Sequence, residues 1–417
     1  DVIGQLSNEQ ALGLVSLMLM AVALVPGMPK LPFISLALML GGAAYAAWRT
    51  SQKEAVQLPE AEEARPEAPE DMYNMLLVDP FELEIGYGLI PLVSEDRSDN
   101  LLRRITSIRR QIASEMGMVL PIVRVRDNLR LSPNEYLIKI RGEEVARGEL
   151  MLERQLAIPG SQSEGKLTGV KTQEPAFGLP ALWITDADKA RAEMMGYTVV
   201  DPVSVLSTHL TEIVRVQAPD LLGRQEVQEM IERVRQERPA AVDGLVPEMI
   251  SLGGLQAVLR NLLRERIPIR DLAGIFEILA NNAGVTQDPG ILAEAVRQRM
   301  ARTISNQYRD STKTLHVFTL APDLEMQLKQ SLVSSEEGLA LQLDPSAAQM
   351  LIGKLGEQME KMAQTGSMPI LLTSREIRRA LRMLVERSLP GLIILAFSEV
   401  SQGTKVQAHG MVTLAEE

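Results

Sequence analysis

Two uncharged apolar runs near the N-terminus, separated by a proline-rich turn, constrain this chain more than any other feature. Residues 11–25 read ALGLVSLMLMAVALV, and residues 31–48 form a second run without a charged side chain. The turn PGMPKLP, residues 26–32, contains three prolines and cannot continue a helix. Because each run is about long enough to cross a bilayer, we expect two transmembrane spans within residues 9–49. The alternatives are a buried helical hairpin and a signal peptide, although a second span would not follow a signal peptide.

The charges that flank these runs predict their orientation. Arg49 and Lys53 follow the second run, whereas the first ten residues carry acids and no base. The positive-inside rule therefore predicts that the C-terminal module lies in the cytoplasm. Neither run contains an ionisable residue, which an ion or proton path would need. The sequence starts at Asp1 rather than Met, so we expect a fragment whose proton-coupling groups, if any, lie upstream.

An acidic linker is predicted at residues 50–78. Between residues 54 and 71 the chain has seven acidic side chains, one basic side chain and three prolines. Such a segment cannot bury enough apolar surface to fold alone, and its like charges keep it extended. The simplest interpretation is a solvated spacer. The sharper hypothesis is that the linker docks on a neighbouring molecule through the apolar side chains that begin at Met72 and Tyr73.

Beyond the linker, the residue patterns predict a mixed α/β multidomain fold. Alternation over residues 81–85 indicates a strand, and residues 99–116 read as a helix capped by Asp99 and stopped by Gly117. Further strands are expected at 119–126 and 135–141, with a turn at 141–143. Residues 153–201 are rich in Gly, Pro and Thr and read as an insertion, after which a helix resumes. We therefore expect a first α/β subdomain at 79–152 plus 202–221 and an inserted second subdomain at 153–201.

The remaining chain is expected to form an all-α third subdomain and an α/β fourth subdomain. Apolar side chains recur at helical spacing from 222 to 301, with Ile267-Pro268 ending one helix and Asp288-Pro289 opening another that runs toward Tyr308. The fourth subdomain, 302–417, alternates strands and helices. Strands are predicted near 315–320, 368–372, 392–397 and 406–412, and helices near 322–332, 345–362 and 374–387.

Composition excludes several chemistries. The net charge of −11 argues against nucleic-acid binding, which requires a basic face. The chain has no cysteine, and its three histidines, His209, His316 and His409, are far apart in sequence and lack zinc-site spacing. No metalloprotease or nucleophile-elbow motif is present. We therefore predict a protein that is not an enzyme, with no metal and no cofactor.

One string imitates a nucleotide-binding loop. Residues 160–167 match G-x-x-x-x-G-K, but Leu167 stands where the loop needs Ser or Thr for magnesium. Gly169 and Pro175 are unfavourable for the helix whose amides would face the phosphate. We expect a flexible polar loop. A nucleotide-driven transporter subunit is kept as an alternative hypothesis that a labelled-ATP titration would decide.

Two positions stand out as candidate binding residues. Phe177 lies between Pro175 and Pro180 and precedes Gly178, so turn chemistry either displays it at a cleft or anchors it into its own domain. His209 sits near the middle of the helix predicted at 202–221. It is either a functional polar group or a partly buried histidine with satisfied hydrogen bonds.

Several strings closely resemble the export-gate (FHIPEP) family of type III secretion, and its flagellar members in particular. They are VPGMPKLPF, RVRDNLRLSPNEYLIKIRG, KTQEPAFGLPALWI, GYTVVDPVSVLSTHLTEIV, LLGRQEVQ and NLLRERIPIRDL. The resemblance covers essentially the whole chain. The family's F-H-I-P-E-P segment and first six spans are absent, so the chain resembles the last two spans plus the cytoplasmic domain.

The resemblance implies a non-enzymatic, multi-pass protein of the bacterial inner membrane. Its cytoplasmic domain would have four subdomains and form a nine-membered ring with copies of itself. The implied partners are flagellar export chaperones with their substrates, other membrane and cytoplasmic export proteins, and the lipid bilayer. The alternatives are an injectisome export-gate homologue and a purely structural ring platform.

The resemblance also implies a docking cleft between the first two subdomains. Gly86 would be a hinge or packing position of the same domain. The cleft residues carried over by matched position are Glu174, Phe177, Leu179, Val200, Val205 and Thr208.

Overall fold

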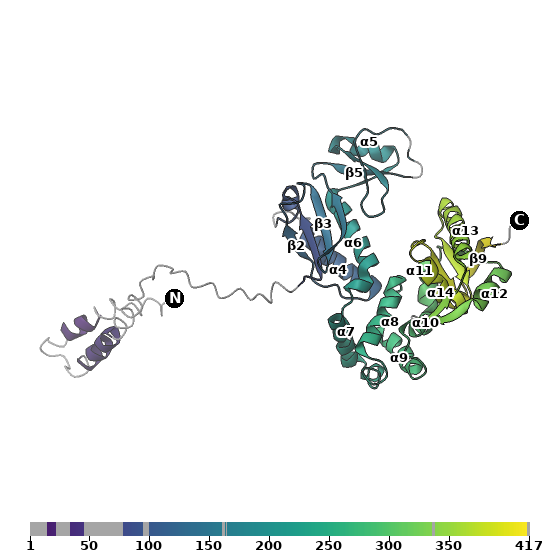
Figure 1. The fold of residues 1–417 in the computed structure, drawn as a ribbon. Coiled ribbons are helices and arrows are strands. Elements are labelled where there is room, and N and C mark those ends of the chain that lie inside the picture. Colours follow the sequence, from purple (N-terminus) through teal and green to yellow (C-terminus); the bar gives the residue numbers. More distant parts are fainter. Residues whose placement is uncertain are drawn as a thin grey trace. The chain divides into compact units, whose positions relative to one another are not determined.

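The computed structural model describes residues 15–21, 34–45, 78–94, 100–160, 163, 165–335 and 338–414. The chain divides into two compact units, 1–77 and 78–417 (Figure 1). The linker predicted at 50–78 lies outside the described residues except for Val78, and so do Met72 and Tyr73. Their predicted docking to a neighbour therefore stays a prediction.

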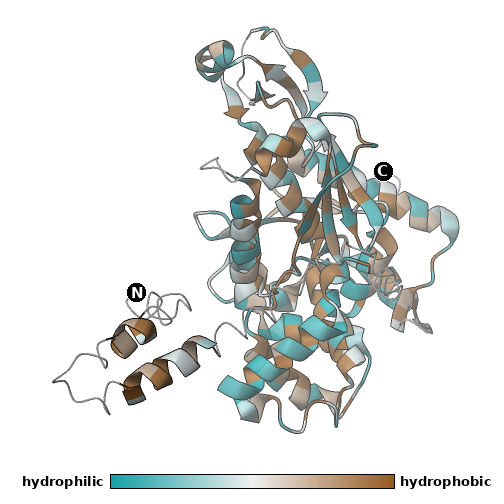
Figure 2. Cartoon of the chain, turned by 90° about the vertical axis from the view of Figure 1, so that its left-hand side faces the viewer, coloured by the Kyte–Doolittle hydropathy of each residue, from teal (hydrophilic) through white to brown (hydrophobic). Residues whose placement is uncertain are grey.

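The N-terminal unit contains two helical segments, residues 15–21 and 34–45, both largely apolar (Figure 2). Ser16 Oγ donates to the carbonyl of Ala37 at 2.7 Å and so joins the two segments. Among the residues described, no helix is both long and apolar enough to cross a membrane. The runs predicted as spans also cover residues outside the described ranges, so the two spans remain a prediction.

The second unit begins with a mixed four-stranded sheet of order β2-β1-β3-β4. Strand β1 (Phe81–Ile85) runs parallel to β2 (Arg124–Asp127) and antiparallel to β3 (Glu135–Ile140), which pairs with β4 (Glu143–Glu149). Short helix η2 (Tyr87–Leu92) follows β1, and helices α4 (Leu101–Met116) and α6 (Pro202–Leu221) pack together in this part of the fold.

Two predicted boundaries in this part of the fold were wrong. The cap of α4 is Asn100, whose side chain accepts from the amide of Leu102 at 2.8 Å, and not Asp99. The strand predicted at 119–126 begins only at Arg124, because Pro121 has no amide hydrogen to contribute to a ladder. The predicted stop at Gly117 is confirmed, with φ of 78°.

The segment predicted as an insertion folds as an antiparallel sheet of order β6-β7-β5-β8. Its strands are β5 (Gln155–Pro159), β6 (Val170–Gln173), β7 (Pro180–Ile184) and β8 (Tyr197–Val200), and α5 (Lys189–Met194) precedes β8. Asp201 then caps α6 by accepting from the amide of Ser204 at 2.9 Å. The helix predicted at 202–221 is confirmed.

Helices fill the next segment. They are α7 (Arg224–Glu237), α8 (Leu252–Arg264), α9 (Leu272–Ala283), α10 (Pro289–Arg299) and α11 (Ala301–Tyr308). Asp271 and Asp288 cap α9 and α10 through the amides of Gly274 and Gly290. The continuous helix predicted from 289 toward Tyr308 is interrupted at Met300, where α10 ends and α11 begins.

The C-terminal part is a parallel sheet of order β13-β12-β9-β14. Its strands are β9 (Thr314–Leu320), β12 (Ile370–Thr373), β13 (Ile393–Ala396) and β14 (Lys405–Val412). The helices of this part are α12 (Pro322–Gln330) and α13 (Pro345–Gln364), between β9 and β12, and α14 (Arg375–Val385), between β12 and β13. The predicted order of strands and helices is confirmed. A hairpin of β10 (Leu332–Ser335) and β11 (Gly338–Leu341) was not predicted.

Two hydrophobic cores meet at this parallel sheet. Leu315 and Val317 of β9 belong to a core that continues through the helical segment to the first sheet. Phe318 and Leu320 belong to a second core with α12, α13 and α14. Successive side chains of a strand face opposite sides, so β9 serves both cores. The architecture is a mixed α/β fold with several sheets, and the division into four subdomains at the predicted boundaries stays a prediction.

Candidate functional site

The loop between β6 and β7 is a rigid turn held by its own hydrogen bonds. The amide of Glu174 donates to Leu179 at 2.7 Å, and the amide of Gly178 donates back to Glu174 at 2.8 Å. The Glu174 carboxylate accepts from the amides of Ala176 at 2.9 Å and Phe177 at 2.7 Å. Gly178 has φ of +68°, which glycine adopts without strain. The turn is therefore defined before any partner arrives.

This turn holds an aromatic side chain out in solvent. Phe177 is 61% exposed and Leu179 is 46% exposed, although both are large and apolar. Of the two alternatives that the sequence left open for Phe177, this exposure favours display over anchoring in its own domain. Exposed aromatic side chains on a rigid support are common anchors of protein interfaces. Whether Phe177 contacts a partner stays a prediction.

A cavity with a volume of 340 Å³ lies beside Phe177. Helix α6 contributes a row of hydroxyls to it, of which Thr208 and Thr211 donate to the carbonyls of Ser204 and Ser207. Because each hydroxyl hydrogen is used inside the helix, its oxygen lone pairs remain available as acceptors. The lining residues are Arg104, Ser107, Ile108, Gln111, Phe177, Ser204, Ser207, Thr208, Thr211, Glu212 and Arg215.

A second hollow of 560 Å³ shares the same turn. Glu174, Pro175 and Gly178 line it together with Arg147 and Lys171. The turn thus borders two concave surfaces, one rich in hydroxyls and one with basic side chains.

Below the first cavity, a buried hydrogen bond fixes α6 on the first sheet. The Tyr136 hydroxyl lies 2.7 Å from Nδ1 of His209, which is 4% exposed. Burial raises the pKa of Tyr136 and lowers the pKa of His209, so both groups stay neutral near pH 7. The interpretation of His209 as a buried histidine with a satisfied hydrogen bond is confirmed.

The predicted docking residues differ in exposure and fall into a surface group and a buried group. Phe177 and Thr208 line one cavity, and Leu179 is exposed on the same turn. Glu174 and Val205 are 3% and 2% exposed, so neither presents its side chain on the surface. Val205 lies on the inward face of α6, and the carboxylate of Glu174 is engaged by backbone amides.

Val200 and Gly86 lie elsewhere. Val200 is half-buried at the end of β8, next to the start of α6. Gly86 follows β1, and a Cβ built there would lie 2.1 Å from the carbonyl oxygen of Ser132. That close approach supports the packing role predicted for Gly86, whereas its role as a hinge stays a prediction.

Residues of α4 at the cavity were not predicted. Arg104, Ser107 and Gln111 share one outward face because they are spaced three and four positions apart. The polar face of α4 can be recognised from its spacing in the sequence. That this face lines a cavity with Phe177 depends on the packing of α4 beside α6.

The string that imitates a phosphate loop lacks the required architecture. Residues 165–169 contain no helix, and the next element is strand β6, beginning at Val170. A phosphate loop would pass directly into a helix. Residues 161, 162 and 164 lie outside the described ranges.

The fold matches a class of solved structures that includes a cytosolic domain from a type III secretion system. It matches the structure of the Chlamydia pneumoniae CdsV protein with a TM-score of 0.73 at 25% identity, covering 81% of this chain and 98% of that one. It also matches the nonameric EscV cytosolic domain from the type III secretion system, with a TM-score of 0.64 at 22% identity, covering 80% and 97%.

The family follows from the sequence. The FHIPEP family model matches residues 1–405, and the chain belongs to the FHIPEP family. It is 40% identical to the flagellar biosynthesis protein FlhA of Bacillus subtilis over 355 residues, 85% of this chain and 52% of that protein. It is 35% identical to the protein of the same name from Borreliella burgdorferi over 420 residues, 100% and 60%. The chain therefore spans about half to three-fifths of these relatives.

Proposed function

We propose that this chain is a non-enzymatic part of a flagellar type III protein export gate. It docks complexes of export chaperones with their substrates and passes them to a membrane channel. The observation that carries the proposal is Phe177, held exposed on a rigid turn beside a hydroxyl-lined cavity. The family, and relatives named flagellar biosynthesis protein FlhA, support the flagellar system.

The surface suits an amphipathic helix of a chaperone. Phe177 and Leu179 provide apolar contact area, and the hydroxyls of α6 accept hydrogen bonds at the edge. Helix-in-groove recognition uses this combination of apolar anchors and a few oriented polar groups. In this proposal Glu174 and Val205 are supports that hold the turn and α6 in place, and Thr208 contacts the partner.

The membrane part of the proposal rests on the sequence. Two spans within residues 9–49 anchor the chain in the bacterial inner membrane, and the acidic linker at 50–78 joins them to a cytoplasmic module of four subdomains. The module forms a ring of nine copies, and Met72 and Tyr73 dock on the neighbouring copy. The nonameric assemblies of EPEC SctV-C and EscV support the ring, since this chain shares their fold.

The flagellar assignment is favoured over an injectisome homologue. The curated relatives named flagellar biosynthesis protein FlhA are 35–40% identical to this chain. The secretion proteins known by structure are 16–25% identical.

A binding experiment tests the docking surface. The purified 417-residue chain is immobilised and titrated with a flagellar chaperone–substrate complex, and Phe177→Ala is compared with wild type. Loss of a central aromatic anchor commonly costs 2 kcal/mol or more, so we expect a reduction in affinity of about 30-fold. Val285→Ala is the matched control, because Val285 is 89% exposed and apolar but lies between α9 and α10.

The control is expected to bind like wild type. Equal binding by Phe177→Ala and wild type would reject this docking surface. It would favour a purely structural ring platform if the complex also binds a chain that carries Thr208→Ala with unchanged affinity.

A further inference from the structure

Two histidines that are 93 positions apart in sequence meet on the parallel sheet. Nδ1 of His316, on β9, lies 2.7 Å from Nε2 of His409, on β14. Gln407 is in register with His316, so His409, two residues further along β14, faces the same side of the sheet. His409 also lies within the irregularity between Ala408 and Met411, and such bulges often re-aim a side chain.

A carboxylate fixes the orientation of one ring. Oδ2 of Asp310 lies 3.2 Å from Nε2 of His316. The amides of Thr312 and Thr314 donate to Oδ1 of Asp310 at 2.8 Å each, which favours the ionised carboxylate. Nε2 of His316 therefore carries the hydrogen, and the lone pair of its Nδ1 faces His409. Metal-ligating histidines are commonly held by a carboxylate in this way.

The distance between the two nitrogens fits a right-angle pair of metal ligands better than a tetrahedral pair. With metal–nitrogen bonds of about 2.0–2.1 Å, adjacent ligands at a right angle are about 2.9 Å apart and tetrahedral ligands about 3.3 Å apart. The 2.7 Å separation therefore needs to open by only a few tenths of an ångström for a right-angle pair, and both rings must also turn until their lone pairs point at the ion instead of at each other. Square-planar or octahedral nitrogen sites are typical of Cu²⁺ and Ni²⁺.

We propose that His316 and His409 form a two-imidazole site for a divalent transition-metal ion such as Ni²⁺ or Cu²⁺. Asp310 is the residue that orients His316. Within the described part of the chain, no group of three or more His, Asp or Glu side chains could hold a metal ion, so water fills the remaining positions. The site is open and exchangeable, because His409 is exposed on edge strand β14.

Binding requires one proton to move within the neutral pair. The His409 hydrogen shifts from Nε2 to Nδ1, and the freed lone pair joins that of His316 Nδ1 on the metal. No net proton is released. The bound ion links β9 to β14, and because it binds the folded chain it stabilises that state in proportion to its concentration.

Calorimetry with Ni²⁺ tests the site. The tag-free 417-residue chain, stripped with a chelator, is titrated with NiCl₂. We expect one ion per chain, at least tenfold weaker binding for His316→Asn and for His409→Asn, and binding weakened about 10–100-fold for Asp310→Asn. Gln407→Ala is the matched control, because it is an exposed change on the same strand that leaves both imidazoles in place.

A second measurement uses the wild-type chain alone. Carbethoxylation of His316 and His409, followed by mass spectrometry, is expected to be suppressed by Ni²⁺ and not by Mg²⁺, which prefers oxygen ligands. Buried His209 is the internal reference. The proposal is overturned if Ni²⁺ leaves both His316 and His409 reactive, or if the histidine variants bind Ni²⁺ as tightly as wild type.

Discussion

The hydroxyl of Tyr136 and Nδ1 of His209 are 2.7 Å apart in a buried contact, which joins β3 to the helix that lines the cavity beside Phe177. Tyr136 also fills the space above Gly148, where a Cβ would lie 2.4 Å from the Tyr136 hydroxyl oxygen. This polar contact inside an apolar core therefore fixes the position of helix α6 relative to strands β3 and β4.

Tyr136→Phe is expected to destabilise the fold. The change leaves Nδ1 of His209 buried without this partner, which typically costs about 1–3 kcal/mol. Urea denaturation measures the loss. Tyr197→Phe is the control, since the Tyr197 hydroxyl makes an exposed contact of 3.5 Å, and its free energy of unfolding should change by less than about 0.5 kcal/mol. Equal stability of the two variants would contradict this role for the Tyr136 hydroxyl.

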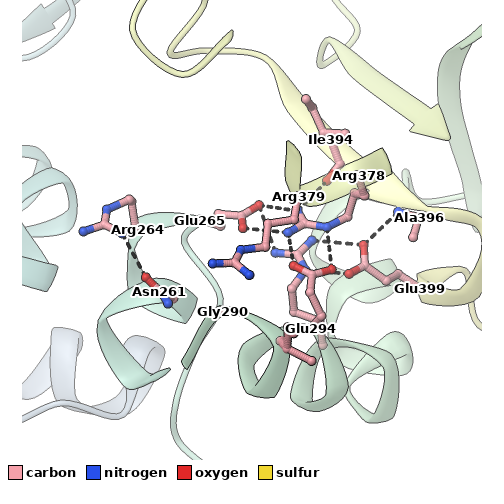
Figure 3. A network of polar contacts seen from close by, with 12 residues as sticks. Asn261, Arg264, Glu265, Gly290, Glu294, Arg378, Arg379, Ile394, Ala396 and Glu399 are labelled. Atoms are coloured by element: carbon pink, nitrogen blue, oxygen red, sulfur yellow. Dashed lines mark hydrogen bonds and ion pairs between the residues drawn. The ribbon is translucent and has the colours of Figure 1, made fainter. Parts of the chain in front are cut away.

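A buried charge network joins the helical segment to the parallel sheet (Figure 3). Arg378 on α14 donates to both carboxylate oxygens of Glu265, at 2.6 and 3.0 Å, and also to Glu294 on α10. Arg297 on α10 donates to Glu399 at 2.5 and 3.0 Å. Arg378 and Glu399 are each 1% exposed.

Arg378→Met should therefore be strongly destabilising. The change removes the positive charge that pairs with the carboxylates of Glu265 and Glu294 in a buried site. Removing one partner of a buried ion pair costs about 3–5 kcal/mol. The measurement is the free energy of unfolding in urea. Arg233→Met, which removes an exposed ion pair with Glu237, should cost less than about 1 kcal/mol. A small effect at Arg378 would mean that the network adds little to stability.

The same network predicts a loss of stability in acid. Burial raises the pKa of Glu265, but Arg297 and Arg378 outweigh it and lower the pKa from 4.5 to about 2. A lowered folded-state pKa gives stability that is fully present above about pH 4.5 and is lost as pH falls toward 2. That difference corresponds to about 3 kcal/mol. Urea denaturation from pH 6 to 2.5 should show a steeper decline for wild type than for Glu265→Gln, and parallel curves would contradict the assignment.

Gly86→Ala tests the close packing behind β1. The new Cβ would lie 2.1 Å from the Ser132 oxygen and 2.7 Å from the Pro133 oxygen, both backbone atoms. Because backbone must move, we expect a loss of about 1–3 kcal/mol, measured by thermal or urea unfolding. Gly353→Ala, at an exposed position of α13 with no neighbouring atom within 4 Å, should instead stabilise the chain by about 0.5–1 kcal/mol. Loss of stability at both positions would argue against a specific clash at Gly86.

Local patterns predicted much of this fold. The alternation in β1, the full length of α6 and the start of α10 at Asp288-Pro289 are each encoded by a few neighbouring residues. The Pro and Gly residues beside Phe177 predict its turn, but only the structure shows that the side chain is exposed. Predicted boundaries failed before β2, where Pro121 lacks an amide hydrogen for the ladder, and at Met300, where α10 ends and α11 begins.

The sequence by itself determined most of the periodic elements, the turn around Phe177 and the family. Only the tertiary structure decided which side chains meet. Parallel pairing of β9 with β14 brings His316 to His409, and the tertiary fold brings Arg378 of α14 to Glu265 across 113 positions. Periodicity and capping depend on a few neighbouring residues, whereas these contacts depend on strand order and helix packing, which no local pattern encodes.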